Sequence, residues 1–210
     1  MLGQIARGAS WQEAVEAIQQ ARPDAAGNGS VMRCWPVALA HWDDLDALLA
    51  DSRLQSRVAH PHAECVAGCA FVNTAIYHLA RGATPRAAIA RALEQAEAPT
   101  ALRQAIAAAP TKQREELPSS GWVRHTLESA VWGLLTTDSF EEAVVQVVNL
   151  GNDADTAGAV VGALAGAAYG LSAIPSAWRA AVHGEWPLHS GVRWDEARLV
   201  ALADRLTGKV

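Results

Sequence analysis

The chain has 210 residues, half of them hydrophobic, which is enough for one domain with a single sizeable core. Its 17 basic and 22 acidic residues give a net charge of −5, which argues against non-specific nucleic-acid binding because that needs clustered positive charge. The three cysteines are an odd number without scaffold-like spacing, and the N-terminus has no apolar signal segment. We therefore expect one domain over residues 1–210, in a reducing cytoplasmic compartment.

Helix signals dominate the first half of the chain. Residues 10–13 form a capping box, so a helix is expected to begin directly after Ser10. Residues 62–81 are apolar at helical spacing and end at Gly82, a residue typical of helix termination. Thr84 followed by Pro85 is an N-cap before a proline at the first helical position, which predicts another helix there.

The second half shows the same signals. Residues 109–120 are charged and flanked by proline, which indicates an exposed connection. Residues 122–136 and 195–206 are amphipathic at helical spacing. A second capping box, residues 139–142, precedes the one candidate strand, residues 144–150, and favours a helix there. These patterns predict an all-α fold.

The segment from Thr156 to Trp178 has no charged residue and is long enough to span a bilayer. It is, however, dominated by alanine and glycine, contains Pro175, and has no basic anchor at its entrance. Glycines at four-residue spacing permit close approach of another helix in a water-soluble protein as well as in a membrane. We therefore expect a buried core helix and no membrane partner.

Two aspartates and a threonine precede that segment. Asp153, Asp155 and Thr156 place two carboxylates and a hydroxyl within one helical turn, and hard divalent cations prefer such all-oxygen sets. An equally simple interpretation is that Asp155 caps the following helix and complements its dipole. The residues alone leave both interpretations open.

A second unusual loop contains two glycines. Gly27-Asn28-Gly29-Ser30 precedes an apolar stretch and could present backbone N–H groups to a phosphate. It lacks the lysine of a P-loop and the spacing of a dinucleotide fingerprint, so a plain glycine turn is the alternative.

Together these loops resemble a known family. GNGSVMRCWPVAL and NLGNDADTAGAVVGALAGAAYG are similar to two signature segments of the ADP-ribosylglycohydrolases, in particular the branch that reactivates dinitrogen reductase. The similarity continues through residues 169–175, and residues 58–62 and 121–123 resemble two further family segments. The resemblance implies a compact all-α fold and hydrolysis of the bond between ADP-ribose and a modified protein side chain or related conjugate.

The resemblance also assigns site residues. A two-metal centre, usually Mg²⁺ and alternatively Mn²⁺, would take Asp153, Asp155 and Thr156 as ligands. Such a centre suits the reaction, since it orients ribose hydroxyls and lowers the pKa of a bound water. The substrate, an ADP-ribosylated protein or ADP-ribose conjugate, would lie against two loops and two ring side chains: Gly27, Asn28, Gly29, Ser30, His60, Trp122, Gly151 and Asn152.

The chain departs from the family pattern at a threonine and at a cluster of acidic residues. Ala59 replaces the family's threonine. The N-terminal Thr-Asp-Asp cluster has no counterpart, because Asp43 and Asp44 follow the glycine loop and suit the start of an exposed helix. We therefore expect a C-terminal part of the fold without its N-terminal helices. The catalytic group and the other ligands would lie upstream of Met1. Two carboxylates balance only one divalent ion, so the chain alone should bind at most one well.

Two other functions stay open. A relative without the N-terminal acidic ligands could bind ADP-ribose, or act structurally, without catalysis. A helical membrane or packing protein built on the glycine-spaced segment is the third hypothesis.

Three minor patterns favour structural roles. Cys65 and Cys69 are interpreted as core thiols instead of zinc ligands, and His125 with Glu128 as a surface pair. Four tryptophans at apolar-periodic positions are expected in the core: Trp11, Trp35, Trp132 and Trp178.

Overall fold

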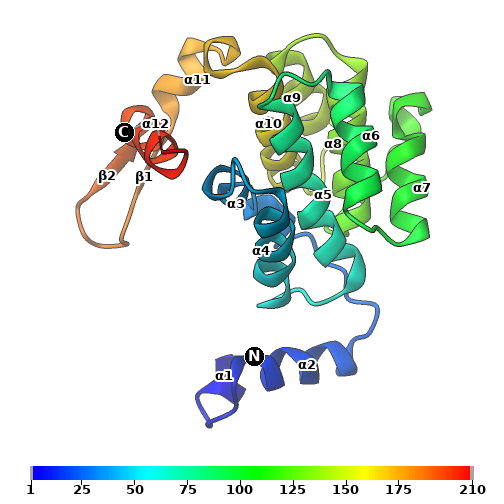
Figure 1. The fold of residues 1–210 in the computed structure, drawn as a ribbon, viewed down its shortest axis with the longest axis vertical. Coiled ribbons are helices and arrows are strands. Elements are labelled where there is room, and N and C mark those ends of the chain that lie inside the picture. The colour runs from blue at the N-terminus through cyan, green and yellow to red at the C-terminus, as the bar shows by residue number, and fades with distance from the viewer. Residues whose placement is uncertain (1, 209–210) are drawn as a thin grey trace.

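A computed structural model describes residues 2–208, and helices form most of it (Figure 1). The all-α prediction is confirmed. The helices are α1 (Leu2–Ile5), α2 (Trp11–Ala21), α3 (Pro36–Ala40), α4 (Leu45–Arg57), α5 (Ala63–Leu79), α6 (Pro85–Gln95), α7 (Thr100–Ala108), α8 (Val123–Thr136), α9 (Phe140–Val148), α10 (Ala154–Tyr169), α11 (Ser176–Ala181) and α12 (Glu196–Leu206).

Helix α5 lies at the centre of the bundle. It packs against α4, α6, α8 and α10, and nearly all its residues from Glu64 to Leu79 are buried. A helix that is apolar on all sides is expected in such a central position. Cys65 and Cys69 are buried free thiols, as predicted for the core. The helix ends as predicted, with Gly82 in the left-handed region at φ +81°.

The uncharged segment after Asp155 forms a core helix that is shorter than the segment itself. Helix α10 ends at Tyr169 because Gly170 takes a positive φ of +80°, and a short 3-10 turn and α11 follow. It packs against α9, α8 and α5. Within residues 2–208, no helix has the length and apolar character needed to cross a membrane.

Close contact between α8 and α9 depends on a glycine. A Cβ added at Gly133 would lie 2.4 Å from Cγ2 of Val147 and 3.1 Å from the backbone oxygen of Ala143. Both neighbours belong to α9, which in turn packs against α10. Gly133 therefore sets how closely α9, and the loop that leaves it, approach the core.

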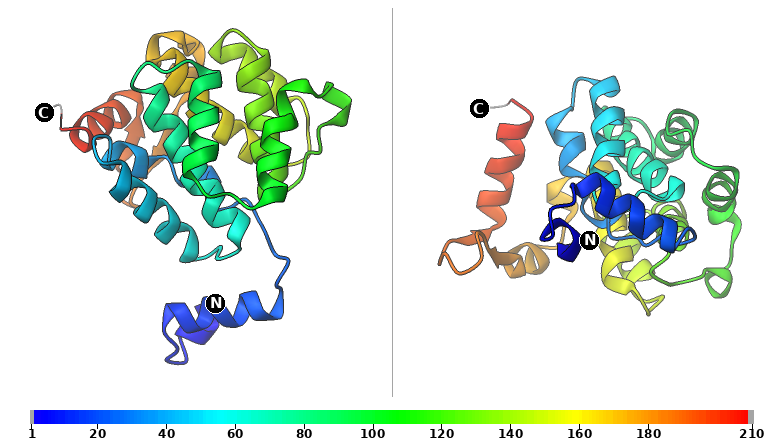
Figure 2. Two further views of the ribbon diagram at one scale, coloured as in Figure 1. Left: turned by 45° about the vertical axis from the view of Figure 1, so that its right-hand side comes forward. Right: turned by 90° about the horizontal axis from the view of Figure 1, so that it is seen from below.

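The N- and C-terminal segments lie outside this bundle (Figures 1 and 2). Helices α1 and α2 lie at one end, and α2 begins at the predicted capping box of Ser10 and Glu13. Along one side of the bundle, at the left of Figure 1, α11 leads to an antiparallel hairpin of β1 (His183–Glu185) and β2 (Arg193–Asp195), followed by α12. The hairpin was not expected, because two three-residue strands are too short for an alternating pattern.

Several local predictions need correction. Glu128 is not on the surface: it is 2% exposed and forms an ion pair with Lys112, while the Nδ1 of His125 lies 2.8 Å from Oγ of Ser120. Helix α8 is covered at Glu128 by the chain around Lys112, a tertiary contact that helical spacing does not reveal. Trp132 is buried and Trp35 and Trp178 are partly buried, but Trp11 is 37% exposed.

Replacement of Gly133 tests the packing of α8 on α9. Gly133→Ala should lower the free energy of unfolding by about 1–3 kcal/mol, because the added methyl group meets backbone as well as a side chain. Urea unfolding followed by circular dichroism measures this. Gly162→Ala in α10 is the matched control: no atom lies within 4 Å of its added Cβ, so it should keep or raise stability. Equal stability of Gly133→Ala and wild type would contradict this packing.

Candidate functional site

The side-chain amide of Asn28 connects three parts of the candidate site. Its Nδ2 donates one hydrogen bond to Oδ2 of Asp153 and another, 2.8 Å long, to Oγ1 of Thr126 in α8. Asn28 is 8% exposed, so these bonds are largely shielded from water. The glycine loop, the start of α8 and the aspartate loop are therefore held together by one side chain.

The aspartate loop makes a tight turn before α10. Gly151 and Asn152 both have positive φ, +78° and +51°, a conformation that glycine and asparagine adopt more readily than other residues. The turn directs the carboxylate of Asp153 toward Asn28 and Thr156. Oγ1 of Thr156 donates to Oδ1 of Asp153 at 3.1 Å. Both oxygens of Asp153 thus accept a hydrogen bond inside the site.

The capping interpretation of Asp155 is wrong. Asp153 occupies the N-cap position of α10, and its side chain makes no capping hydrogen bond. Asp155 lies within the first helical turn and is exposed, while Thr156 is buried at 6% exposure. The negative charge of both carboxylates still complements the positive end of the helix dipole.

These donors suit one hard divalent cation. Asp153, Asp155 and Thr156 supply carboxylate and hydroxyl oxygens at the start of one helix, and Mg²⁺ commonly binds one or two carboxylates and keeps several waters. Among residues 2–208, no three or more His, Cys, Asp or Glu side chains are grouped around one metal position. The donor set therefore fits one ion better than two.

Backbone pairing brings Trp122 to the glycine loop. Gly27 and Trp122 form an isolated antiparallel bridge, with Val123 N donating to Ala26 O at 2.8 Å and Asn28 N to Gly121 O at 3.0 Å. A Cβ on Gly121 would lie 3.8 Å from Oδ2 of Asp153. The family's Gly-aromatic-Val segment is thus beside the aspartate carboxylate, and the Trp122 residue is 40% exposed.

His60 packs against the glycine loop at Gly29. A Cβ on Gly29 would lie only 2.8 Å from Nε2 of His60, so a larger residue at this position would displace the His60 ring. The ring also borders a cavity of about 310 Å³ between α2 and the loop, next to Gly27. Burial, and to a smaller extent the positive charge of Arg33, lower the pKa of His60.

Ser30 lies in the core instead of on a ligand surface. It is 0% exposed, and its Oγ accepts a 3.0 Å hydrogen bond from Ser56. The following residues, Val31–Arg33, form only a short 3-10 turn, in which Val31 N and Met32 N donate to Asn28 O. These two N–H groups serve the turn itself, so it offers less to a phosphate than the sequence suggested.

The predicted exposed connection, residues 109–120, is part of the site. Oγ of Ser119 donates to the backbone oxygen of Gly151 at 2.7 Å, and Nη2 of Arg114 donates to that of Asn149 at 2.6 Å. Both contacts hold the aspartate loop from outside. No residue pattern marked them, because they depend on where the chain crosses the surface.

Sequence reasoning also missed Thr126, which accepts from Asn28, and Met32, whose Sδ lies 3.7 Å from Oγ1 of Thr156. A signal for Thr126 existed, since it lies one helical turn after Trp122 on the same face. Met32 had no such signal in the sequence, apart from its position in the family segment.

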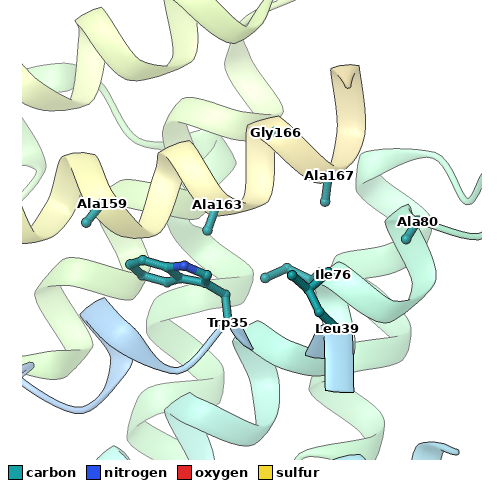
Figure 3. Close-up of a pocket in the computed structure, with 8 residues that line it drawn as sticks. All are labelled: Trp35, Leu39, Ile76, Ala80, Ala159, Ala163, Gly166 and Ala167. Atoms are coloured by element: carbon teal, nitrogen blue, oxygen red, sulfur yellow. The ribbon is translucent and has the colours of Figure 1, made fainter. Parts of the chain in front are cut away.

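An apolar cavity of about 420 Å³ runs along α10 from one turn beyond Asp155 (Figure 3). The ring of Trp35 lies beside Ala159 and Ala163, with Ile76 next to it. The cavity offers no charged group to a diphosphate or a metal: its lining is Trp35, Leu39, Ile76, Ala80, Ala159, Ala163, Gly166 and Ala167. The candidate site is therefore the polar cluster at the start of α10 and not this cavity.

The fold is mainly helical, with an aspartate loop held against a glycine loop, and comparison with known proteins assigns it to a class of hydrolases. The family model for ADP-ribosylglycohydrolase matches residues 1–210, and the chain belongs to this family. It is 34% identical over 177 residues to ADP-ribosylarginine hydrolase Tri1 of Serratia proteamaculans (strain 568). It is 35% identical over 156 residues to ADP-ribosyl-[dinitrogen reductase] glycohydrolase of Rhodospirillum rubrum.

A solved structure, described as an ADP-ribosylglycohydrolase-related protein complex, has the same fold, with a TM-score of 0.75 and 32% sequence identity. That match covers 98% of this chain and 70% of the other. The curated matches cover 83% and 73% of this chain but only 46% and 49% of the relatives. The chain thus spans about half the length of the curated relatives it matches.

The lowered pKa of His60 predicts acid sensitivity. Folded protein keeps His60 neutral at pH values where the unfolded chain, with an ordinary pKa of about 6.5, already binds a proton. The contribution of His60 is therefore complete above about pH 6.5 and is lost as pH falls through the lower folded pKa. His60→Gln should reduce the loss of stability between about pH 7 and 5, measured by urea unfolding. His183→Gln, an exposed site, is the control. An unchanged pH slope in His60→Gln would contradict the prediction.

Proposed function

We propose that this chain carries the ADP-ribose-binding and metal-binding part of a Mg²⁺-dependent hydrolase that cleaves ADP-ribose from a modified protein side chain. The arrangement of Asn28, Asp153 and Thr156 is the observation that supports this most strongly. Mn²⁺ has the same ligand preferences and could replace Mg²⁺. Buried free thiols at Cys34, Cys65 and Cys69 suit a reducing cytoplasmic compartment.

The relatives suggest which linkage to test first. One is named for ADP-ribosylarginine and another for ADP-ribosyl-dinitrogen reductase. We infer a protein substrate that bears ADP-ribose, with the arginine linkage as the first candidate. The net charge of −5 gives no support to a nucleic-acid substrate.

The reaction needs a water positioned beside the ribose carbon that bears the side chain. A divalent ion held by Asp153, Asp155 and Thr156 would lower the pKa of a water and orient the ribose hydroxyls. Asn28 fixes the orientation of the Asp153 carboxylate, and Thr156 satisfies its other oxygen, so that this ligand is held before substrate arrives. Trp122 and His60 would border the nucleotide, one on each side of the glycine loop.

Charge balance supports a second candidate function. Two divalent ions bring four positive charges, and Asp153 and Asp155 contribute two negative ones. Within residues 2–208 no further acidic cluster accompanies them. A second ion and the acid/base group would need carboxylates from an additional polypeptide segment. Without them, the chain would bind ADP-ribose and not release it from the modified side chain.

Substitution of Asp155 tests the proposed function. Asp155→Asn removes one exposed charge without touching the core, so the fold should persist while Mg²⁺-dependent release of ADP-ribose from an ADP-ribosylated arginine peptide falls at least about a hundredfold. Release is measured by chromatography of free ADP-ribose, and the fold by circular dichroism. Asp43→Asn, also an exposed acid, should leave release unchanged.

Equal release by Asp155→Asn and wild type would contradict the hydrolase. Wild-type protein that binds ADP-ribose with Mg²⁺ but releases none from the peptide would support the non-catalytic alternative. Absence of both binding and release would contradict both candidate functions.

A further inference from the structure

Glu64 is a buried carboxylate outside the proposed metal site. It lies in the first turn of α5, 4% exposed, and both of its oxygens accept hydrogen bonds from side chains at the start of α8. Oε2 accepts from Nε1 of Trp122 at 3.0 Å, and Oε1 accepts from Nε of Arg124 at 3.1 Å and from its Nη2. One carboxylate thus holds two side chains at the edge of the candidate site.

Trp122 is constrained at both its backbone and its ring. Its backbone pairs with Gly27, and its amide donates to Oγ of Ser120 at 3.3 Å. Indole has a single donor, and the bond to Glu64 uses it, which fixes the rotation of the ring. The guanidinium carbon of Arg124 lies 5.0 Å from the ring centroid, in cation–π range.

Trp122 nevertheless remains 40% exposed as a residue, although the ring of His125 also lies near its ring, with the centroids 5.6 Å apart at an interplanar angle of 35°. An exposed aromatic ring held in one orientation is a suitable stacking surface for a nucleobase, since stacking requires a defined plane. Buried ion pairs often contribute little to stability, because desolvation offsets their attraction. Positioning of the ring is a better reason for Glu64 than stability is.

We propose that Glu64 is a positioning residue: its buried carboxylate holds the indole of Trp122 and the guanidinium of Arg124 as a platform on which the adenine ring of ADP-ribose stacks. The inference rests on the proposed function for the identity of the ligand. Glu64 itself touches no ligand and acts through Trp122.

Glu64→Gln tests this, because the amide cannot pair its charge with Arg124 while accepting from Trp122. Binding of ADP-ribose and of AMP should weaken about fivefold, measured by calorimetry in the presence of Mg²⁺, while ribose 5-phosphate, which lacks the base, binds as before. In a Trp122→Ala background, Glu64→Gln should have no further effect. Equal effects of Glu64→Gln in both backgrounds, or no loss in either, would overturn the proposal.

Glu128→Gln is the matched control. Glu128 is likewise a buried, ion-paired carboxylate, but its partner is Lys112 and the aromatic platform does not include it. It should lose stability without a selective loss of adenine-containing ligands. Should Glu64→Gln not fold, Trp122→Phe keeps a ring but cannot donate to Glu64. It should bind AMP more weakly than wild type, and equal binding would overturn the proposal.

A measurement without ligand separates this inference from the proposed function. Trp122→Phe identifies the indole N–H resonance of Trp122 in a ¹⁵N spectrum, and Glu64→Gln should shift that resonance and speed its exchange with water. An unchanged resonance overturns the role of Glu64 whatever the ligand is. A wild-type protein that binds neither ADP-ribose nor AMP contradicts the adenine platform and the proposed function together, even if the resonance moves.

Discussion

The hydrogen bonds of the Asn28 side chain are the interaction on which the candidate site depends. They join a loop before α3, the first turns of α8 and the residue that precedes α10. These segments are far apart in the sequence. Because Asn28 is buried, replacement by an apolar residue would leave Asp153 and Thr126 without this hydrogen-bond partner.

Charge is the second constraint on the site. Asp153 and Asp155 lie close together near the positive end of α10, and the helix dipole together with the hydrogen bonds to Asp153 reduces the cost of holding them there. Such an arrangement holds carboxylates ready for a cation. The adjacent cavity along α10 has the opposite character, because the residues that line it are uncharged and mostly apolar (Figure 3).

Local signals in the sequence predicted several of the helices. Caps at Ser10 and Thr84 and the stop at Gly82 appear where expected, because they depend on bonds within a few residues. Tertiary contacts could not be predicted from such local signals. Glu128 is buried and forms an ion pair with Lys112, and Ser119 donates a hydrogen bond to the aspartate loop. Both contacts join segments far apart in the sequence, so no local pattern predicts them.

The sequence predicted only part of the site, because the rest depends on tertiary contacts. Family resemblance selected Asn28 and Asp153, which the structure brings together, but it gave no indication that Ser30 is buried or that Glu64 holds Trp122. Those outcomes depend on side-chain orientation. The resemblance identifies positions along the chain, and packing decides whether each one faces a ligand or the core.

Calorimetric titration of the protein with Mg²⁺ tests the central claim most directly, since it asks whether the clustered oxygens bind a cation at all. The account predicts one ion per chain, with binding lost when Asn28 is replaced by leucine in protein that remains folded. Absence of Mg²⁺ binding by the wild-type chain, or full binding by Asn28→Leu, would contradict it.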